Sequence, residues 1–219
     1  MAETTDFDPI RRSRLGESTA FRKNKDGAHS RLVEIRRTIC RHFDIRNIGM
    51  AILKILTYPD PFLKKKADPV IDFDDPLKQL AADMIETMYA SLGIGLAATQ
   101  IGANKRMIVL DVKHNPKDPD SRPQPQVMIN PTVVQCEGEA ANEEGCLSVP
   151  DFRAEVKRCT SVTLTYRDME NNIHRVRSEG LESICIQHEL DHLNGKLFID
   201  HLPPLQRKMV KTKLKKRSN

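Results

Sequence analysis

The chain of 219 residues, 39% of them hydrophobic, is long enough for one domain with short extensions, since domains commonly span about 100–200 residues. No segment approaches the ~18 uncharged apolar residues of a membrane span, so we expect no membrane partner. The net positive charge of +5 comes from the two ends of the chain. Residues 1–49 carry 11 Lys and Arg against 7 Asp and Glu, and residues 206–219 carry 7 Lys and Arg and no acidic residue. The part between them is acidic, which argues against DNA as a partner.

Residues 1–49 are predicted to form an N-terminal extension that is poorly ordered or not native. Their arginines are scattered among Ser, Thr, Asp and Glu, and only Leu32–Ile39 approaches a helical stripe. A transit peptide is disfavoured, because such leaders are poor in acidic residues and this segment has seven. A sustained apolar pattern begins at Met50, which could itself be the true start.

The first long helix is predicted to begin at Asp75 and to end at Gly93. Asp75 suits the N-cap, Pro76 suits the first helical position, and Gly93 is a typical C′ residue. Between them the apolar residues recur at helical spacing: Leu77, Leu80, Ala81, Met84, Ile85 and Met88.

The rest of the chain is predicted to contain three strands and two further helices. The strands are expected over Met107–Val112, Val127–Asn130 and Ser161–Tyr166, with a proline-rich surface loop over His114–Gln126. The helices are expected over about Leu181–Asn194, stopped by Gly195, and from Leu205 to the end. Helices and strands without regular βαβ alternation indicate an α+β fold.

Five cysteines are spread over the chain, an odd number without a secretory leader: Cys40, Cys136, Cys146, Cys159 and Cys185. A disulfide scaffold is therefore not expected, and a reducing, cytoplasmic setting is predicted.

The strongest chemical signal is the sequence His-Glu-Leu-Asp-His at His188–His192. On a helix, positions i and i+4 share a face, so His188 and His192 can bind one metal ion while Glu189 reaches a water molecule. The alternative is a pair of ordinary buried histidines. Downstream the chain offers only His201 and no further glutamate, so we expect a third ligand from upstream. Cys146 is a candidate, although a lone cysteine is often an inert apolar residue.

A second motif is the glycine-rich segment Gly93–Gly102. Its glycines permit close approach of the backbone to a ligand, and Gln100 supplies an amide donor. The segment lacks the Lys-Ser/Thr ending of a P-loop and the preceding strand of a dinucleotide fold, so we do not expect nucleotide binding.

Taken together, three segments closely resemble the peptide deformylase family. The motifs G-x-G-x-A-A-x-Q, E-G-C-L-S and Q-H-E-x-D-H occur at Gly93–Gln100, Glu144–Ser148 and Gln187–His192, and the bacterial-type opening occurs at Ile55–Asp60. The resemblance implies mostly antiparallel sheets packed around a central HExxH helix, followed by a C-terminal helix. It also implies a catalytic domain over residues 50–204.

The resemblance further implies the role of each motif residue. One divalent ion, expected to be Fe²⁺ with Zn²⁺ or Ni²⁺ able to substitute, would be held by Cys146, His188 and His192. Glu189 would act as general base and then acid, and the oxyanion would be stabilised by the amide of Gln100 and the backbone N–H of Leu147. The substrate would be an N-formylmethionyl nascent peptide, with formate as a product.

Further residues are candidates for binding the substrate. The methionine pocket is expected to involve Ile94, Gly95, Ile184 and Cys185, and Arg153 could contact the peptide backbone; ordinary core packing is the alternative for each. A buried group of charges around the site is expected from Glu144, Arg158 and Asp191, with surface ion pairs as the alternative.

Residues 205–219 are predicted to form a basic C-terminal helix, anchored by Leu205, Met209 and Val210. Its Lys and Arg residues could dock on ribosomal RNA near the tunnel exit, as the family resemblance also suggests, or could form a frayed, solvated end. We expect a monomer. The alternative functions are a general HExxH metallopeptidase and a ribosome-associated binding protein.

Overall fold

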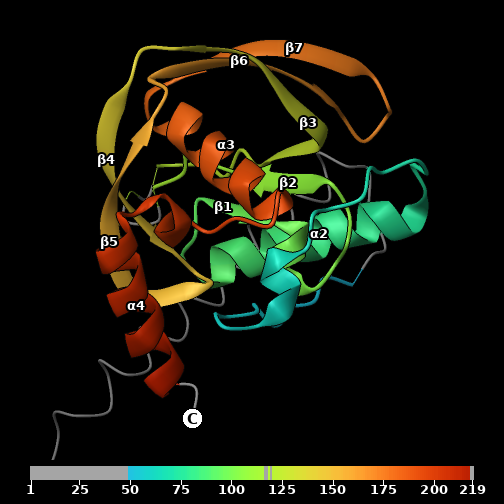
Figure 1. Ribbon diagram of the computed structural model, residues 1–219. Coiled ribbons are helices and arrows are strands. Elements are labelled where there is room, and N and C mark those ends of the chain that lie inside the picture. The colour runs from blue at the N-terminus through green and yellow to red at the C-terminus, as the bar shows by residue number, and fades with distance from the viewer. Residues whose placement is uncertain (1–48, 116–117, 119, 218–219) are drawn as a thin grey trace, which may run out of the picture.

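A computed structural model describes residues 49–115, 118 and 120–217 of the chain (Figure 1). The predicted N-terminal extension lies outside these residues except for Gly49, so its order and the domain boundary at Met50 stay predictions. The described part is an α+β fold, as predicted, with mostly antiparallel strands and a C-terminal helix. Among the described residues, no helix is both long and apolar enough to cross a membrane.

The main sheet has five antiparallel strands in the order β1-β2-β3-β6-β7. These strands are β1 (Gly95–Ala97), β2 (Met107–Leu110), β3 (Gln126–Glu137), β6 (Ser161–Arg167) and β7 (Ile173–Glu179). A separate two-stranded sheet is formed by β4 (Ala140–Cys146) and β5 (Val149–Arg158). The short 3-10 helices are η1 (Pro61–Lys64), η2 (Ala98–Ile101) and η3 (Phe198–His201).

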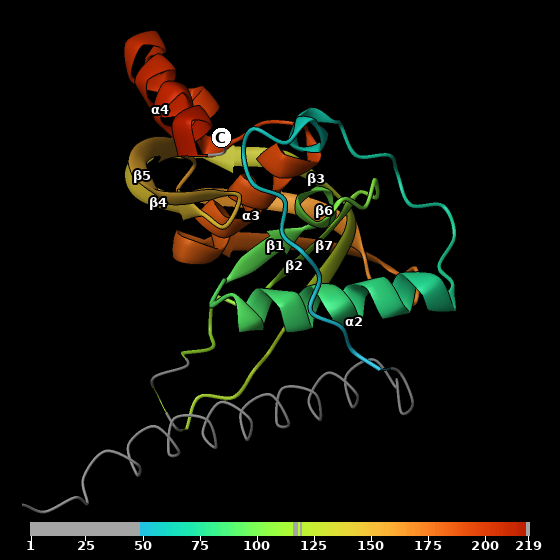
Figure 2. The same ribbon diagram turned by 90° about the horizontal axis from the view of Figure 1, so that it is seen from below.

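Two helices cover opposite faces of the main sheet at β1 and β2. Met107 and Val109 pack into the core cluster of α2 (Asp75–Ala90), whereas Ile108 and Leu110 pack into the cluster of α3 (Gly180–Leu193). Because alternate residues of a strand face opposite sides, β2 is buried along its whole length. Figure 2 shows α2 on the side of β1 and β2 away from α3, and α3 lies near the centre of the molecule in Figure 1.

The predicted helix ends need small corrections at α2. The N-cap is Asp74 and not Asp75, and its carboxylate accepts a hydrogen bond from the backbone N–H of Leu77 at 2.9 Å. At the other end Leu92, with φ of 56°, and not Gly93, adopts the left-handed conformation. The backbone N–H of Gly93 then closes the turn on the carbonyl of Met88 at 2.9 Å.

Helix α3 agrees with the prediction to within one residue at each end, and Gly195 follows it with φ of 70°. A Cβ at Gly195 would lie 2.4 Å from the carbonyl oxygen of Lys64, so both the conformation and the space require glycine there.

The strand β3 continues past Pro131, where the prediction ended it. Asn130 has φ of 52°, and its side chain bonds both the N–H and the carbonyl of Val70 at 2.8 Å. The register of pairing with β6 shifts between Ile129 and Thr132. Pro131 therefore lies at an irregularity of the sheet, where a residue without a backbone N–H is tolerated. The strands β1, β4, β5 and β7 were not predicted.

The C-terminal helix α4 (Pro204–Arg217) packs through residues other than those expected. Val210 and Leu214 are buried against Phe198, whereas Leu205 is 71% exposed and Met209 is 64% exposed. The predicted anchoring by Leu205 and Met209 is therefore wrong; Val210 pairs with Leu214, four residues further on the same face.

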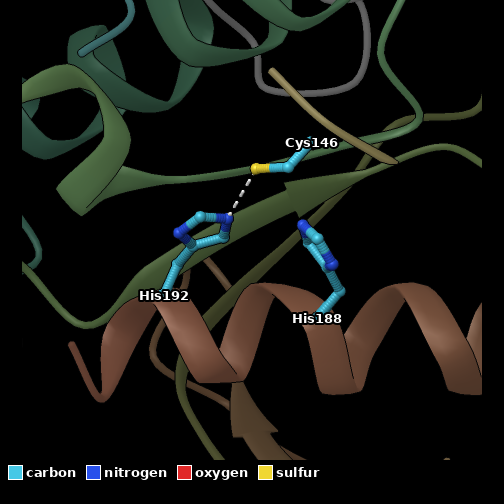
Figure 3. Close-up of side chains that lie close together, drawn as sticks. All are labelled: Cys146, His188 and His192. Atoms are coloured by element: carbon cyan, nitrogen blue, oxygen red, sulfur yellow. Dashed lines mark hydrogen bonds between the residues drawn. The ribbon is translucent and has the colours of Figure 1, made fainter. Parts of the chain in front are cut away.

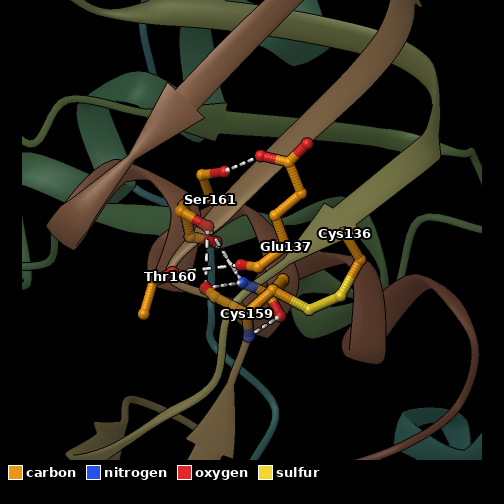
Figure 4. The surroundings of a disulfide bond; sticks show 7 residues. Cys136, Glu137, Cys159, Thr160 and Ser161 are labelled. Carbon is orange, nitrogen blue, oxygen red and sulfur yellow. Dashed lines mark hydrogen bonds between the residues drawn. A yellow bond between two sulfur atoms is a disulfide. The ribbon is translucent and has the colours of Figure 1, made fainter.

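One pair of cysteines departs from the expectation of free thiols. Cys136 on β3 and Cys159, which joins β5 to β6, form a disulfide with Cα atoms 5.7 Å apart (Figure 4). The pairing of β3 with β6 sets Cys136 opposite Val162 and so brings it near Cys159. Among the described residues, Cys146 and Cys185 are free.

Candidate active site

The site is built where the two sheets meet helix α3. Cys146 ends β4, and His188 and His192 stand one turn apart on α3 (Figure 3). One ligand atom from each lies within 4.8 Å of the others, and the Sγ of Cys146 is 3.1 Å from the Nε2 of His192. The structure thus brings together the three residues expected to hold a metal ion.

A buried group of charges lies behind His188, and this prediction is confirmed. Glu144 accepts from the Nδ1 of His188 at 2.8 Å and from the Nε and Nη2 of Arg158 at 2.7 and 3.0 Å. Arg158 also donates to Asp191 at 2.6 Å. Since Nδ1 of His188 is occupied by Glu144, its Nε2 is the nitrogen available to a metal ion.

The electrostatics of this group favour bound positive charge. Burial would raise the pKa of Glu144, but the hydrogen bonds from His188 and Arg158 outweigh it and lower that pKa. Burial lowers the pKa of His192, which keeps its imidazole neutral. At His188 burial acts in the same direction, but the contacts with Cys146 and Glu144 outweigh it and raise the pKa.

Glu189 points into the site beside Gly95. Burial, its largest influence, raises the pKa of Glu189 to about 7, and its Oε2 has no hydrogen-bond partner among the described residues. A Cβ on Gly95 would lie 2.6 Å from the Oε1 of Glu189 and 2.7 Å from the Sγ of Cys185. Gly95 is therefore needed for the close approach of β1 to α3.

Gln100 is held rigidly on η2. Its Oε1 accepts from the backbone N–H of Ala97 at 2.8 Å, so its Nε2 is directed toward Ser148, at 3.1 Å, and toward the Sγ of Cys146, at 3.7 Å. An amide donor is thereby fixed next to the cysteine ligand, with its orientation set by the backbone.

The residues expected to bind substrate surround one hollow of about 950 Å³. Its lining includes every member of that set and all three expected catalytic residues: Ile94, Gly95, Ile184, Cys185, Arg153, Gln100, Leu147 and Glu189. Arg153 is at the solvent side, with a side chain 68% exposed and its Nη1 3.7 Å from Glu143.

Some residues of the site were missed. The hydroxyl of Ser148 accepts the hydrogen bond from the Nε2 of Gln100, and Phe152 and Leu181 line the hollow. His201, considered only as a metal ligand, instead places its Nε2 2.7 Å from the Oδ2 of Asp191. No local pattern signals these contacts, because they depend on how η2, η3, the β4–β5 hairpin and α3 pack together.

A divalent metal ion fits these residues. One thiol and two imidazoles converge, and the buried Oε2 of Glu189 beside them lacks a hydrogen-bond partner within the described part of the chain. One sulfur and two nitrogen ligands suit Zn²⁺ and also admit Fe²⁺.

Comparison with known proteins places the chain in a family. The family model for polypeptide deformylase matches residues 52–208. The chain is 47% identical over 167 residues to the peptide deformylase of Alkalilimnicola ehrlichii, covering 76% of this chain and 91% of that protein.

Two solved structures are similar as well. The crystal structure of a peptide deformylase from Legionella pneumophila has a TM-score of 0.69 at 45% identity and covers 77% of this chain and 96% of that one. A peptide deformylase from Synechococcus elongatus in complex with actinonin has a TM-score of 0.68 at 37% identity, covering 76% and 90%. The chain therefore belongs to the polypeptide deformylase family.

Proposed function

We propose that the hollow around Cys146, His188 and His192 binds N-formylmethionyl peptides and hydrolyses the formyl amide to formate and a free N-terminus. The observation that carries the proposal is the convergence of the three ligand atoms within 4.8 Å, beside the buried carboxylate of Glu189. Family membership supports the substrate class.

Cys146, His188 and His192 would hold one divalent ion, which supplies Lewis-acid activation of water and of the formyl carbonyl. We infer Fe²⁺ as the ion in the cell, with Zn²⁺ or Ni²⁺ able to replace it. A thiolate and two neutral imidazoles leave a net charge of about +1 on a divalent site, lower than three imidazoles would leave. Water is then activated less strongly, and a nearby base matters more.

Glu189 is that base. Its carboxylate takes a proton from the attacking water and later gives it to the amine nitrogen as the C–N bond breaks. In the metal-free site burial raises the pKa of Glu189 to about 7, which makes this carboxyl a better proton donor near neutral pH than an ordinary glutamate. The proton balance closes, because the amine gains what the water loses.

The developing oxyanion is stabilised by two donors, the Nε2 of Gln100 and the backbone N–H of Leu147. The hydrogen bond from Ala97 to the Oε1 of Gln100 fixes the amide before substrate arrives, so little reorganisation is needed. Removing one such donor costs about 10²–10³ in turnover in other hydrolases.

The methionine side chain enters the apolar part of the hollow beside Ile94, Ile184 and Cys185, and Gly95 lets the substrate backbone approach β1. Arg153 contacts the peptide backbone at the solvent side, because its guanidinium is largely exposed and its ion pair with Glu143 is a long one, at 3.7 Å.

The basic face of α4 docks on ribosomal RNA near the tunnel exit, in the cytoplasm, and the protein works as a monomer. Support comes from the exposed lysines of α4, which include Lys208, Lys213 and Lys215. Binding of these lysines to phosphates releases counterions, so the affinity for RNA falls steeply as the ionic strength rises.

The test measures formate released from formyl-Met-Ala, with acetyl-Met-Ala and an internal peptide bond as controls. Turnover of the formyl peptide alone supports the proposal. Comparable cleavage of an internal bond would instead favour a general metallopeptidase. Cys146→Ser should lose metal, and normal metal stoichiometry in that variant would remove Cys146 from the ligand set.

A further inference from the structure

The disulfide between Cys136 and Cys159 closes a loop that carries half of the site. The two cysteines are 23 positions apart in the sequence, and the segment between them contains strands β4 and β5. On this hairpin lie the expected metal ligand Cys146 and, behind His188, Glu144 and Arg158. The hairpin belongs to the two-stranded sheet and not to the five-stranded one, so the disulfide is a covalent link between the base of the hairpin and β3.

Cys159 is also bonded directly to the helix of the metal ligands. Its backbone N–H donates to the Oε1 of Gln187 at 2.9 Å, and its carbonyl accepts from the Nε2 of Gln187 at 2.9 Å and from the Oγ of Ser183 at 3.0 Å. Gln187 immediately precedes His188, and Arg158 immediately precedes Cys159. A displacement of Cys159 would therefore reach both sides of the site.

The disulfide is accessible from outside. Cys136 is exposed, Cys159 is half-buried, and both line a hollow of about 300 Å³ that does not include the metal ligands. Arg106 and Arg158 also line this hollow. Arg106 donates to two uncharged groups, the carbonyl of Pro131 and the side chain of Asn194, so its charge attracts anions. Asp191 lines the hollow too, but is paired with Arg158.

We propose that Cys136–Cys159 is a thiol–disulfide exchange site for a small anionic thiol, with glutathione as the type, and that its reduction loosens the hairpin and weakens metal retention. The inference rests on the proposed ligand set of Cys146, His188 and His192. Coupling runs from the disulfide through Arg158 and Glu144 to His188, and through the β4–β5 hairpin to Cys146.

The exchange is a two-electron reduction in two steps. The thiolate of one glutathione attacks the Sγ of the exposed Cys136, the S–S bond breaks, and Cys159 leaves as a thiolate that takes up a proton. A second glutathione thiolate attacks the mixed disulfide, which frees Cys136 as a thiol and yields glutathione disulfide. The reverse sequence restores the link.

The experiment equilibrates the Zn²⁺-loaded full chain in buffers of varied ratio of reduced to oxidised glutathione. Alkylation followed by peptide mass spectrometry gives the redox state of Cys136 and Cys159 separately from the other cysteines. Transfer of Zn²⁺ to a chromogenic chelator gives metal retention. We expect release about tenfold faster from the reduced form, since groups behind metal ligands commonly change affinity about 10–100-fold.

Two variants sharpen the test. Cys136→Ser should release Zn²⁺ as fast as the reduced wild type at every glutathione ratio. Val134→Ser, on the same strand and 50% exposed in the wild type, should keep the wild-type redox response. Thermal unfolding of each variant shows that it is folded.

Two results would overturn the proposal: Zn²⁺ release that is equal in both redox forms, or a disulfide that stays intact in excess reduced glutathione. Failure of the underlying ligand set is distinguishable, because Cys146→Ser would then bind Zn²⁺ normally whatever the redox state of the disulfide.

Discussion

The Nδ1 of His188 lies 2.8 Å from the Oε2 of Glu144, although the two residues are 44 positions apart in the sequence. Glu144 is buried on β4 and His188 on α3, so this contact ties the hairpin to the helix at the point where the metal ligands converge. It fixes the orientation of the ring and turns Nε2 toward the site.

Replacing Glu144 should therefore weaken metal binding without touching a ligand. Glu144→Ala should lower metal affinity by about 10–100-fold, since it frees the ring of His188 and leaves Arg158 with Asp191 as its remaining carboxylate. A competition titration with a chelator measures the change. The neighbouring Glu143→Ala, at a side chain 66% exposed, is the matched control and should bind metal normally. Equal affinities for the two variants would contradict the role of Glu144.

Glu189→Gln should keep its metal and lose turnover. The amide fills the same space but cannot accept the proton from water, and positioned acid–base groups contribute about 10²–10⁴ in rate. Formate release and metal content, measured on the same preparation, check the two halves of the prediction. Loss of metal from this variant would show that Glu189 is a ligand.

The same substitution should stabilise the metal-free protein above neutral pH. The folded state raises the pKa of Glu189 from 4.5 to about 7, so it holds a proton that the unfolded chain releases. Stability due to this group is therefore lost as pH rises through that window, by up to about 3 kcal/mol at 1.36 kcal/mol per pKa unit. Chemical denaturation of both proteins after chelation, at pH 5 and pH 8, gives the difference. Glu189→Gln should gain relative to wild type only at the higher pH.

Gly95→Ala tests the close approach of β1 to α3. The added Cβ would lie 2.6 Å from the Oε1 of Glu189, which has to shift, so turnover should fall sharply and stability by about 1–3 kcal/mol. Gly145→Ala is the control, because its Cβ would meet Arg153 at an ordinary 3.5 Å. Denaturation midpoints and formate release should separate the two variants. Similar behaviour of both would mean that the space at Gly95 is not limiting.

Helix α2 could be predicted because its apolar residues recur at helical spacing, and β2 because a short, continuous apolar run is typical of a strand buried on both faces. The strands β4 and β7 could not: Ala140–Cys146 and Ile173–Glu179 are largely polar or charged and have exposed positions along most of their length. Their strand structure comes from pairing with β5 and β6, which is not encoded in local periodicity.

The site shows the same division. His188 and His192 follow from helical spacing alone, whereas Cys146 required the resemblance to a family. The contact of His201 with Asp191 depends on the path of η3 after α3, and nothing in the local sequence specifies it.

The role of α4 is best tested by charge reversal and not by deletion. A chain ending at Gln206 would lose Val210 and Leu214, which are buried, and Lys211, which pairs with Asp200 at 2.9 Å. Such a deletion would destabilise the catalytic domain whatever the helix binds.

Reversing exposed charges avoids that problem. The double variant Lys208→Glu/Lys215→Glu should reduce cosedimentation with ribosomes. The dependence of log affinity on log salt concentration should become shallower by about two, one for each lost phosphate contact. The control Lys105→Glu/Lys113→Glu has the same net charge but changes exposed residues away from α4. Both proteins should release formate from a short formyl peptide at the wild-type rate, because none of the four lysines lines the catalytic hollow. Equal ribosome binding by the two variants would remove α4 as the docking element and leave the catalytic proposal untouched.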